Sequence, residues 1–339
     1  MAATMADVAR AAGVSRSTVS YVLSGTRPIS DMTRERILRA MKELNYTPNV
    51  LAQGLAGRRT GIIALIFPLS EVGFNPTEIE YIRAASEQAR EDGYNLLLWP
   101  FGADEIEEVR KVVNQGLVEG VVLMEVLTAD ERVPFLIESD IPFTMIGRTA
   151  DPRDLAYVDT DFEASGSMAV DHVAGLGHTE IGFLARTQDD LDAGHGPAVR
   201  TRDAVLAEAG KLGIRAHIFT ASPTFPAGWD ALKEIRRTAP GLTALLELNE
   251  PATLGLMAAA AEQGIRIPED LSIVAVNASE TTAQMSKPAL TSVSPTHGDL
   301  ARLAVKYLVR RLRGEDQSAF QTLVEPKLIE RGSTAVARS

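Results

Sequence analysis

The sequence predicts an all-α headpiece at the N-terminus and an α/β body of two doubly wound parallel-sheet subdomains. Residues 1–46 hold three short helical patterns, and strand and helix patterns alternate from residue 60 onward. The alternation gives about four crossovers before residue 160 and four after it, enough for two similar α/β layers. A chain of 339 residues also suits two or three domains.

The predicted division of the chain follows from these changes of pattern. We expect a headpiece at 1–48, a hinge helix or linker at 49–59, one subdomain at 60–160 and 295–321, a second at 161–294 and 322–332, and a disordered tail at 333–339.

The first two helices of the headpiece have clear start and stop signals. Thr4 and Asp7 make a capping-box-like start for the first helix, and Gly13 ends it. Ser15 is the N-cap of the second helix, which Gly25 stops.

The third helix of the headpiece is capped by Ser30 or Asp31. Its apolar face consists of Ile37, Leu38, Met41 and Leu44. The following segment, 49–57, has helical residues interrupted by Gly54, so it is marginal as an isolated helix.

The body contains short apolar segments without polar alternation, as in buried parallel strands. We expect strands at 62–67, 96–99, 121–124, 143–146, 181–184, 217–219, 244–246 and 272–276. Amphipathic helices are expected near 77–92, 104–115, 162–176, 200–212, 228–238 and 251–263, and a last helix near 298–313 precedes two short strands near 320–329.

The charge of the chain is divided unevenly. The net charge is −11, but residues 1–59 hold nine lysines and arginines against four acids, a net charge of +5. The other 280 residues therefore carry −16. A basic head on an acidic body is typical of proteins whose head binds nucleic acid.

The segment 8–25 has the pattern of a helix-turn-helix. Gly13 permits the tight turn between the two helices. The second helix then presents Arg16, Ser17, Ser20 and Tyr21 near its start, where a recognition helix meets base edges. Hydroxyl groups and backbone N–H groups at this end can hold a phosphate.

The same residues carry a family resemblance. The pattern Asp7-Val-Ala-x-x-Ala-Gly-Val-Ser15-x-x-Thr18-Val-Ser20 resembles the signature of the lactose-repressor (LacI/GalR) family. Later segments resemble it too, among them Leu44-Asn-Tyr46-x-Pro48-Asn49, Leu176-Gly-His178-x-x-Ile181-Gly and Gly264-x-x-Ile267-Pro-Glu-Asp270. The likeness thus covers nearly the whole chain.

The resemblance implies a dimeric repressor with a periplasmic-binding-protein-like body, which binds a near-palindromic operator and responds to a sugar or sugar-like metabolite. It implies base choice by Arg16, Ser17 and Tyr21, and a hinge helix at 49–57 that folds on the operator. Leu55 matches the apolar side chain that kinks the minor groove. The implied DNA contacts are Thr4, Met5, Ser15, Arg16, Ser17, Thr18, Ser20, Tyr21, Ser24, Asn49, Ala52, Gln53, Leu55 and Ala56.

The ligand site is expected at the carboxyl ends of the parallel strands. Aromatic, amide and guanidinium groups gather there in the sequence, a mixture suited to a sugar-like ligand. The resemblance adds an arginine that grips the ligand, either Arg200 or Arg202, because the family pattern Arg-x-x-Gly-Phe is imperfect here. The candidate ligand contacts are Phe74, Trp99, Met124, Arg148, Arg200, Arg202, Asn249 and Asn277.

Other classes of function fit the sequence less well. The chain has no cysteine, which excludes a disulfide framework and a thiol nucleophile. Its five histidines have no metal spacing, and no complete dinucleotide or phosphate-binding loop is present, so we expect no enzymatic activity, metal or cofactor. The alternative is a solute-binding carrier with the same body fold, against which the helix-turn-helix argues.

The expected location is the cytoplasm. No basic segment followed by an apolar one opens the chain, and no apolar stretch of membrane-spanning length occurs. We expect pairing through the helices near 77–92 and 298–313, and a dimer rather than a tetramer, because the C-terminal residues have no heptad repeat.

Overall fold

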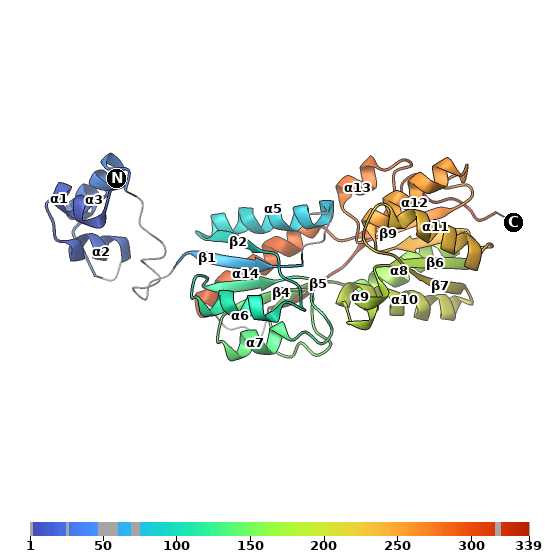
Figure 1. Ribbon diagram of the computed structural model, residues 1–339, viewed down its shortest axis with the longest axis horizontal. Coiled ribbons are helices and arrows are strands. Elements are labelled where there is room, and N and C mark those ends of the chain that lie inside the picture. The colour runs from blue at the N-terminus through green and yellow to red at the C-terminus, as the bar shows by residue number, and fades with distance from the viewer. Residues whose placement is uncertain (1–2, 25–26, 47–59, 69–74, 316–319, 339) are drawn as a thin grey trace. The chain divides into compact units, whose positions relative to one another are not determined.

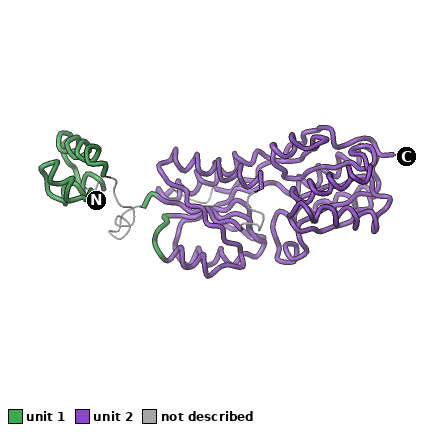
Figure 2. Tube along the Cα trace, turned by 45° about the horizontal axis from the view of Figure 1, so that its top comes forward, with its two compact units in different colours: residues 1–61, 115–119 green, residues 62–114, 120–339 purple. Residues whose placement is uncertain are grey.

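The computed structural model describes residues 3–24, 27–46, 60–68, 75–315 and 320–338 (Figure 1). The chain divides into two compact units, one of residues 1–61 with 115–119 and the other of residues 62–114 with 120–339 (Figure 2). The first unit holds the headpiece, and the second holds both sheets.

The headpiece is formed by α1 (Met5–Ala11), α2 (Arg16–Ser24) and α3 (Asp31–Glu43). The capping box of Thr4 and Asp7 is present at the start of α1. Gly13 follows α1 with a φ of +61°, a left-handed conformation that glycine adopts without strain. At α3 the N-cap is Ser30, whose side chain accepts a hydrogen bond from the Thr33 N–H.

The core of the headpiece differs from the expected one at a single position. Val8, Val19 and Ile37 are fully buried, but Leu38 is 49% exposed and Ala40 lies in the core instead. The reason is helical spacing, since positions 37, 40 and 41 share one face of α3 and position 38 is turned about 100° from the first of them.

The first sheet of the second unit has the strand order β11-β5-β4-β3-β1-β2, and its neighbouring strands all pair in parallel. Its strands are β1 (Ile62–Ile66), β2 (Asn95–Trp99), β3 (Gly120–Leu123), β4 (Phe143–Ile146), β5 (Tyr157–Thr160) and β11 (Gln321–Val324). The helices of this subdomain are α5 (Pro76–Glu91), α6 (Ile106–Asn114), α7 (Arg132–Glu138) and α14 (His297–Leu312). One apolar core joins α5 and α14 to the sheet.

The second sheet has the order β12-β10-β9-β8-β6-β7, in which only the edge strand β12 is antiparallel to its neighbour. Its strands are β6 (Glu180–Ala185), β7 (Arg215–Thr220), β8 (Ala244–Glu247), β9 (Ser272–Val276), β10 (Thr291–Ser294) and β12 (Lys327–Ile329). The helices are α8 (Phe162–Gly175), α9 (Gln188–Asp192), α10 (Gly196–Leu212), α11 (Ala227–Thr238), α12 (Glu250–Glu262) and α13 (Glu280–Met285). Two apolar cores pack against this sheet, one with α11 and α12 and one with α8 and α10.

The second boundary between the subdomains lies three residues later than expected. The change of pattern predicts residues 322–324 in the second subdomain, but β11 pairs with β5 of the first sheet up to Val324. The chain therefore passes to the second sheet between β11 and β12. Five elements were also not expected from the sequence, namely β5, β10, α7, α9 and α13.

The expectation of a disordered tail at 333–339 is wrong for the part that the structure describes. Ser333 is fully buried, and its Oγ donates to the Ile273 carbonyl at 2.6 Å and accepts from the Thr291 N–H at 2.8 Å. The Ala337 N–H donates to the Leu176 carbonyl at 2.8 Å. These bonds satisfy backbone groups at the starts of β9 and β10 and directly after α8, which orders a segment that has no apolar pattern of its own.

None of the helices in the described ranges has both the length and the apolar character needed to cross a bilayer.

Candidate functional site

The second helix of the headpiece presents its N-terminal turn to the surface. Ser15 caps this turn, because its Oγ accepts from the Thr18 N–H at 3.1 Å. Arg16 and Ser17 are exposed, while Val19 is buried against α1 and α3. One face of α2 is therefore fixed in the core, and its start carries a guanidinium and two hydroxyls outward.

Other residues expected to contact DNA flank this turn. The Arg27 guanidinium lies 4.9 Å from the centre of the Tyr21 ring, a cation–π contact that holds the ring on the headpiece. Thr4 is exposed at the start of α1, and Met5 is half-buried against the core. Ser20 lies within α2, as does Ser24 at its end. The expected hinge contacts Asn49, Ala52, Gln53, Leu55 and Ala56 lie outside the described residues.

The second unit contains a cavity between its two subdomains that is partly open to solvent. Its walls come from the carboxyl ends of strands in both sheets and from the start of α5. Residues that line it include Asn75, Thr77, Glu78, Tyr81, Met124, Glu125, Val126, Gly147, Asp159, Thr160, Arg186, His195, Asn249, Glu250 and Asn277. A cavity at this end of two open sheets is where such folds bind ligands.

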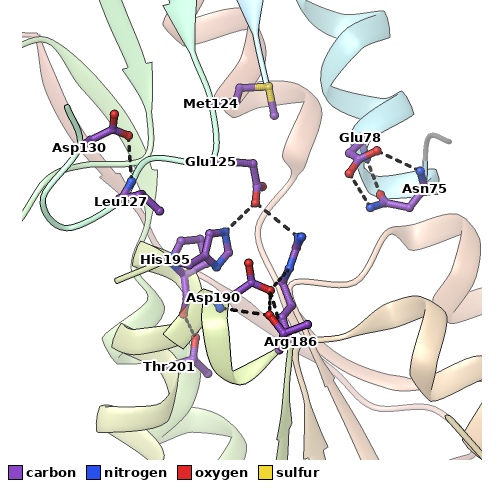
Figure 3. A network of polar contacts seen from close by, with 12 residues as sticks. Asn75, Glu78, Met124, Glu125, Leu127, Asp130, Arg186, Asp190, His195 and Thr201 are labelled. Carbon is purple, nitrogen blue, oxygen red and sulfur yellow. Dashed lines mark hydrogen bonds and ion pairs between the residues drawn. The ribbon is translucent and has the colours of Figure 1, made fainter. Parts of the chain in front are cut away.

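Glu125 links the two walls of the cavity (Figure 3). It follows β3, and its Oε2 accepts from His195 Nε2 at 2.6 Å and lies 3.5 Å from Arg186 Nη1, both on the opposite subdomain. Burial alone would raise the pKa of Glu125, but His195 and Arg186 outweigh it and lower this pKa to about 2. Arg186 is also held by Asp190, at 3.3 Å.

Two other carboxyl groups on the cavity wall are affected by burial. Burial raises the pKa of Asp159 to about 6, although Arg148 lies at 2.7 Å and Arg200 at 3.9 Å. Burial, together with the charges of Glu125 and Glu250, raises the pKa of Glu78 to about 7. Both shifts have the same main cause, because burial disfavours the charged form of these two carboxyl groups.

Glu250, at the start of α12, forms a second link across the cavity. Its Oε2 accepts from Thr77 Oγ1 at 2.8 Å, which lies on the other subdomain. Its Oε1 accepts from Ser279 Oγ at 3.1 Å and from Thr282 Oγ1.

The two asparagines expected to bind ligand both line the cavity. Asn249 caps α12, and its Nδ2 already donates to the carbonyls of Ala185 and Ala221. Asn277 has a φ of +61°, and its Oδ1 accepts from His297 Nε2 at 3.1 Å. Met124 lines the cavity as well, whereas Phe74 lies outside the described residues.

Four other expected ligand contacts are not among the residues that line this cavity, namely Trp99, Arg148, Arg200 and Arg202. Trp99 ends the edge strand β2, while the part of the wall that the first sheet supplies comes from the ends of β3, β4 and β5. Arg200 donates to the carbonyls of Arg148 and Thr149 and stands behind Asp159. Arg202, about 200° farther around α10, pairs with Asp203 instead.

Sequence reasoning missed several lining residues. Asn75-Pro-Thr-Glu78 has the spacing of a capping box with proline at its first helical position, and this signal could have placed Glu78 at the start of α5. Glu250 directly follows the expected ligand contact Asn249, and this position could have indicated it. Asp159 was missed with its strand, since Tyr-Val-Asp-Thr carries an acid where an apolar residue is usual.

Comparison with known proteins identifies the family. A model described as "Bacterial regulatory proteins, lacI family" matches residues 4–49, and one described as "Periplasmic binding protein-like domain" matches residues 170–334. The HTH-type transcriptional regulator DegA of Bacillus subtilis is 30% identical over 341 residues, which is 99% of each chain. The chain belongs to the lacI family of bacterial regulatory proteins.

Solved structures of lacI-family proteins share this fold. The complex of the transcriptional regulator CelR with cellobiose is 26% identical, with a TM-score of 0.73 over 98% of this chain and 99% of that one. The lac repressor dimer bound to operator is 24% identical, with a TM-score of 0.83 over 99% of this chain and 100% of that one. The fold class expected from the sequence is thereby confirmed.

Family membership also decides the class of function. This lacI-family chain is a DNA-binding transcription regulator and not an enzyme, as expected from the sequence. The alternative of a solute-binding carrier is not supported, because the DNA-binding model matches the headpiece and DegA matches the whole chain.

Proposed function

We propose that this regulator is a cytoplasmic homodimeric repressor that binds a near-palindromic operator and is controlled by a neutral saccharide in the cavity between its subdomains. The observation that carries the proposal is the cavity itself, whose polar wall groups come from both subdomains. A ligand that contacts both walls favours one arrangement of the subdomains, and such differential affinity is what allosteric control requires.

The chemistry of the cavity wall supports a ligand rich in hydrogen-bond donors. Glu78, Glu125, Asp159 and Glu250 offer carboxyl oxygens, while the amide N–H groups of Asn249 are already used by backbone carbonyls. Saccharide hydroxyls can donate to such oxygens, whereas a phosphate or carboxylate would add negative charge to an acidic wall. The presence of cellobiose in the related CelR complex points the same way.

DNA recognition is assigned to the headpiece. Arg16, Ser17 and Tyr21 of α2 choose bases, and the basic headpiece supplies a salt-dependent attraction to phosphates. Leu55, in the hinge segment 49–57, opens the central base step in the minor groove.

Pairing of two chains uses the outer face of the first subdomain. Ile79 on α5 is 52% exposed, and Leu98 on the edge strand β2 is exposed as well. The apolar residues of α14 lie mainly in the core, so α5 is a better candidate than α14 for the dimer interface. Light scattering tests this pairing, and a stable tetramer or a monomer would contradict it.

A gel-shift assay with the DNA upstream of the gene tests the regulator function, and it should show a complex that weakens as salt increases. Absence of a complex at every salt and ligand condition would overturn the proposal.

Thermal-shift assays with cellobiose, ribose and glucose 6-phosphate test the ligand class. A neutral sugar should raise the melting temperature and the phosphate should not, and Asn277→Gly, which suits the positive φ, should reduce the shift.

A further inference from the structure

The loop after β3, residues 124–131, joins the two subdomains through its main chain. The Thr128 N–H donates to the Gly194 carbonyl at 2.8 Å, and the Gly196 N–H donates to the Val126 carbonyl at 3.2 Å. Between these two bonds, Leu127 and His195 form an antiparallel β-bridge. The loop belongs to the first subdomain. The residues that it contacts, 194–196, belong to the second subdomain, where they lead into α10.

A buried ion pair shapes the loop from within its own subdomain. The side chains of Asp130 and Arg132 are 0% exposed and lie 2.7 Å apart. Asp130 Oδ2 accepts from the Leu127 N–H at 3.1 Å (Figure 3). Arg132 Nη2 donates to the Glu125 carbonyl at 2.9 Å. The pair therefore holds the loop in shape independently of the second subdomain, and a pair so fully buried is costly to break.

The same contact forms part of the cavity wall. Glu125 and Val126 line the cavity from the loop, and His195 and Pro197 line it from the other side. The bond between Glu125 and His195 crosses between them. A ligand in the cavity therefore meets residues on both sides of the main-chain contact.

The fit depends on two glycines. A Cβ added at Gly196 would lie 2.9 Å from the Val126 carbonyl oxygen and would also meet the Arg200 guanidinium. A Cβ added at Gly194 would collide with Thr128 Oγ1. At Gly196 a side chain would therefore displace the loop backbone, whereas at Gly194 it would displace the Thr128 hydroxyl.

We propose that the loop 124–131 and the segment 194–196 form a main-chain catch, which closes and opens with the cavity and transmits its occupancy to the DNA affinity of the headpiece. This inference rests on the proposed function, because it takes the cavity as the ligand site. Arg132 and Asp130 are positioning residues in this scheme, since they hold the loop and do not line the cavity.

Hydrogen exchange of the full-length protein tests the catch without any ligand. Gly196→Ala should speed exchange in peptides covering 124–131 at least about fivefold, because a loss of about 1 kcal/mol in local stability raises the open population by that factor. Gly210→Ala is the matched control, because it lies on the same helix and a Cβ there meets nothing within 4 Å. Unchanged exchange in 124–131 for Gly196→Ala, or equal acceleration in both variants, would overturn the catch.

A second pair of variants separates the catch from local damage to α10. Gly194→Ala should speed exchange in 124–131, and adding Thr128→Ala should restore slow exchange because the colliding hydroxyl is gone. Both variants carry the same strain from the left-handed φ of +78° at position 194, so that strain cancels in the comparison. A double variant that exchanges as fast as Gly194→Ala alone would overturn the catch.

Gel shifts with the DNA upstream of the gene test the coupling. Gly196→Ala should change the affinity at least about fivefold relative to Gly210→Ala. Equal affinities would overturn the transmission to the headpiece. If the unmodified protein binds none of this DNA, the proposed function fails, while the exchange measurements still decide whether the catch exists.

Discussion

His195 Nε2 lies 2.6 Å from Glu125 Oε2, and the two residues belong to different subdomains. Their contact places a charge-assisted hydrogen bond at the border of the ligand cavity, beside the backbone bonds that join the subdomains.

Glu125→Gln should destabilise the protein by about 1–2 kcal/mol at pH 7, since it removes a charge partner of His195 and Arg186. The pKa of Glu125 is lowered to about 2 in the folded state. The contribution of ionised Glu125 to the free energy of unfolding is therefore complete above the ordinary glutamate pKa. It declines as the pH falls from there toward 2. Urea unfolding at pH 7 and at pH 4 measures this. A difference between variant and wild type that does not shrink at pH 4 would contradict it.

Glu247→Gln should stabilise the protein at alkaline pH. Glu247 is 1% exposed, and burial raises its pKa to about 8. Because the folded pKa lies above the unfolded one, the carboxyl group costs stability progressively as the pH rises through this interval. Relative to wild type, the variant should gain about 3 kcal/mol between pH 5 and pH 8. Exposed Glu262→Gln is the control, and parallel pH profiles for wild type and Glu247→Gln would refute this account.

Arg16→Ala should weaken operator binding by about 1–3 kcal/mol and relax the choice of base at one position. Its guanidinium is exposed at the start of α2. Arg10→Ala removes the same charge from α1, where Arg10 pairs with Asp7 and faces away from the core, and should cost less. Quantitative gel shifts on operator variants compare the two. Equal losses of operator affinity in the two variants would contradict the prediction, because Arg16 would then act through its charge alone.

Leu55→Ala should reduce both operator affinity and DNA bending, because an apolar wedge in the minor groove is what sustains a kink. This prediction comes from the resemblance of the hinge segment to its family. A circular-permutation assay measures the bend angle, and unchanged bending would count against the wedge.

The sequence by itself determined the class of function and the order of the elements, except for the five short ones β5, β10, α7, α9 and α13. Helical periodicity and capping signals located the helices of the headpiece. This was possible because Thr4, Asp7 and Gly13 act only on the residues next to them in the chain. The buried parallel strands were found because they are continuous apolar segments. Residues whose backbone sits at a strand end, such as Met124, Asn249 and Asn277, could be assigned to the cavity for the same reason.

Only the tertiary structure decided which side chains meet. Arg200 and Arg202 look equivalent in sequence, but the rotation of α10 turns one toward Asp159 and the other toward Asp203. The strand β5 carries an acid that is tolerated because arginines from two subdomains surround it. The pairing of Glu125 with His195 joins residues 70 positions apart. Such contacts depend on how the two subdomains lie against each other, and no local pattern in the chain encodes that arrangement.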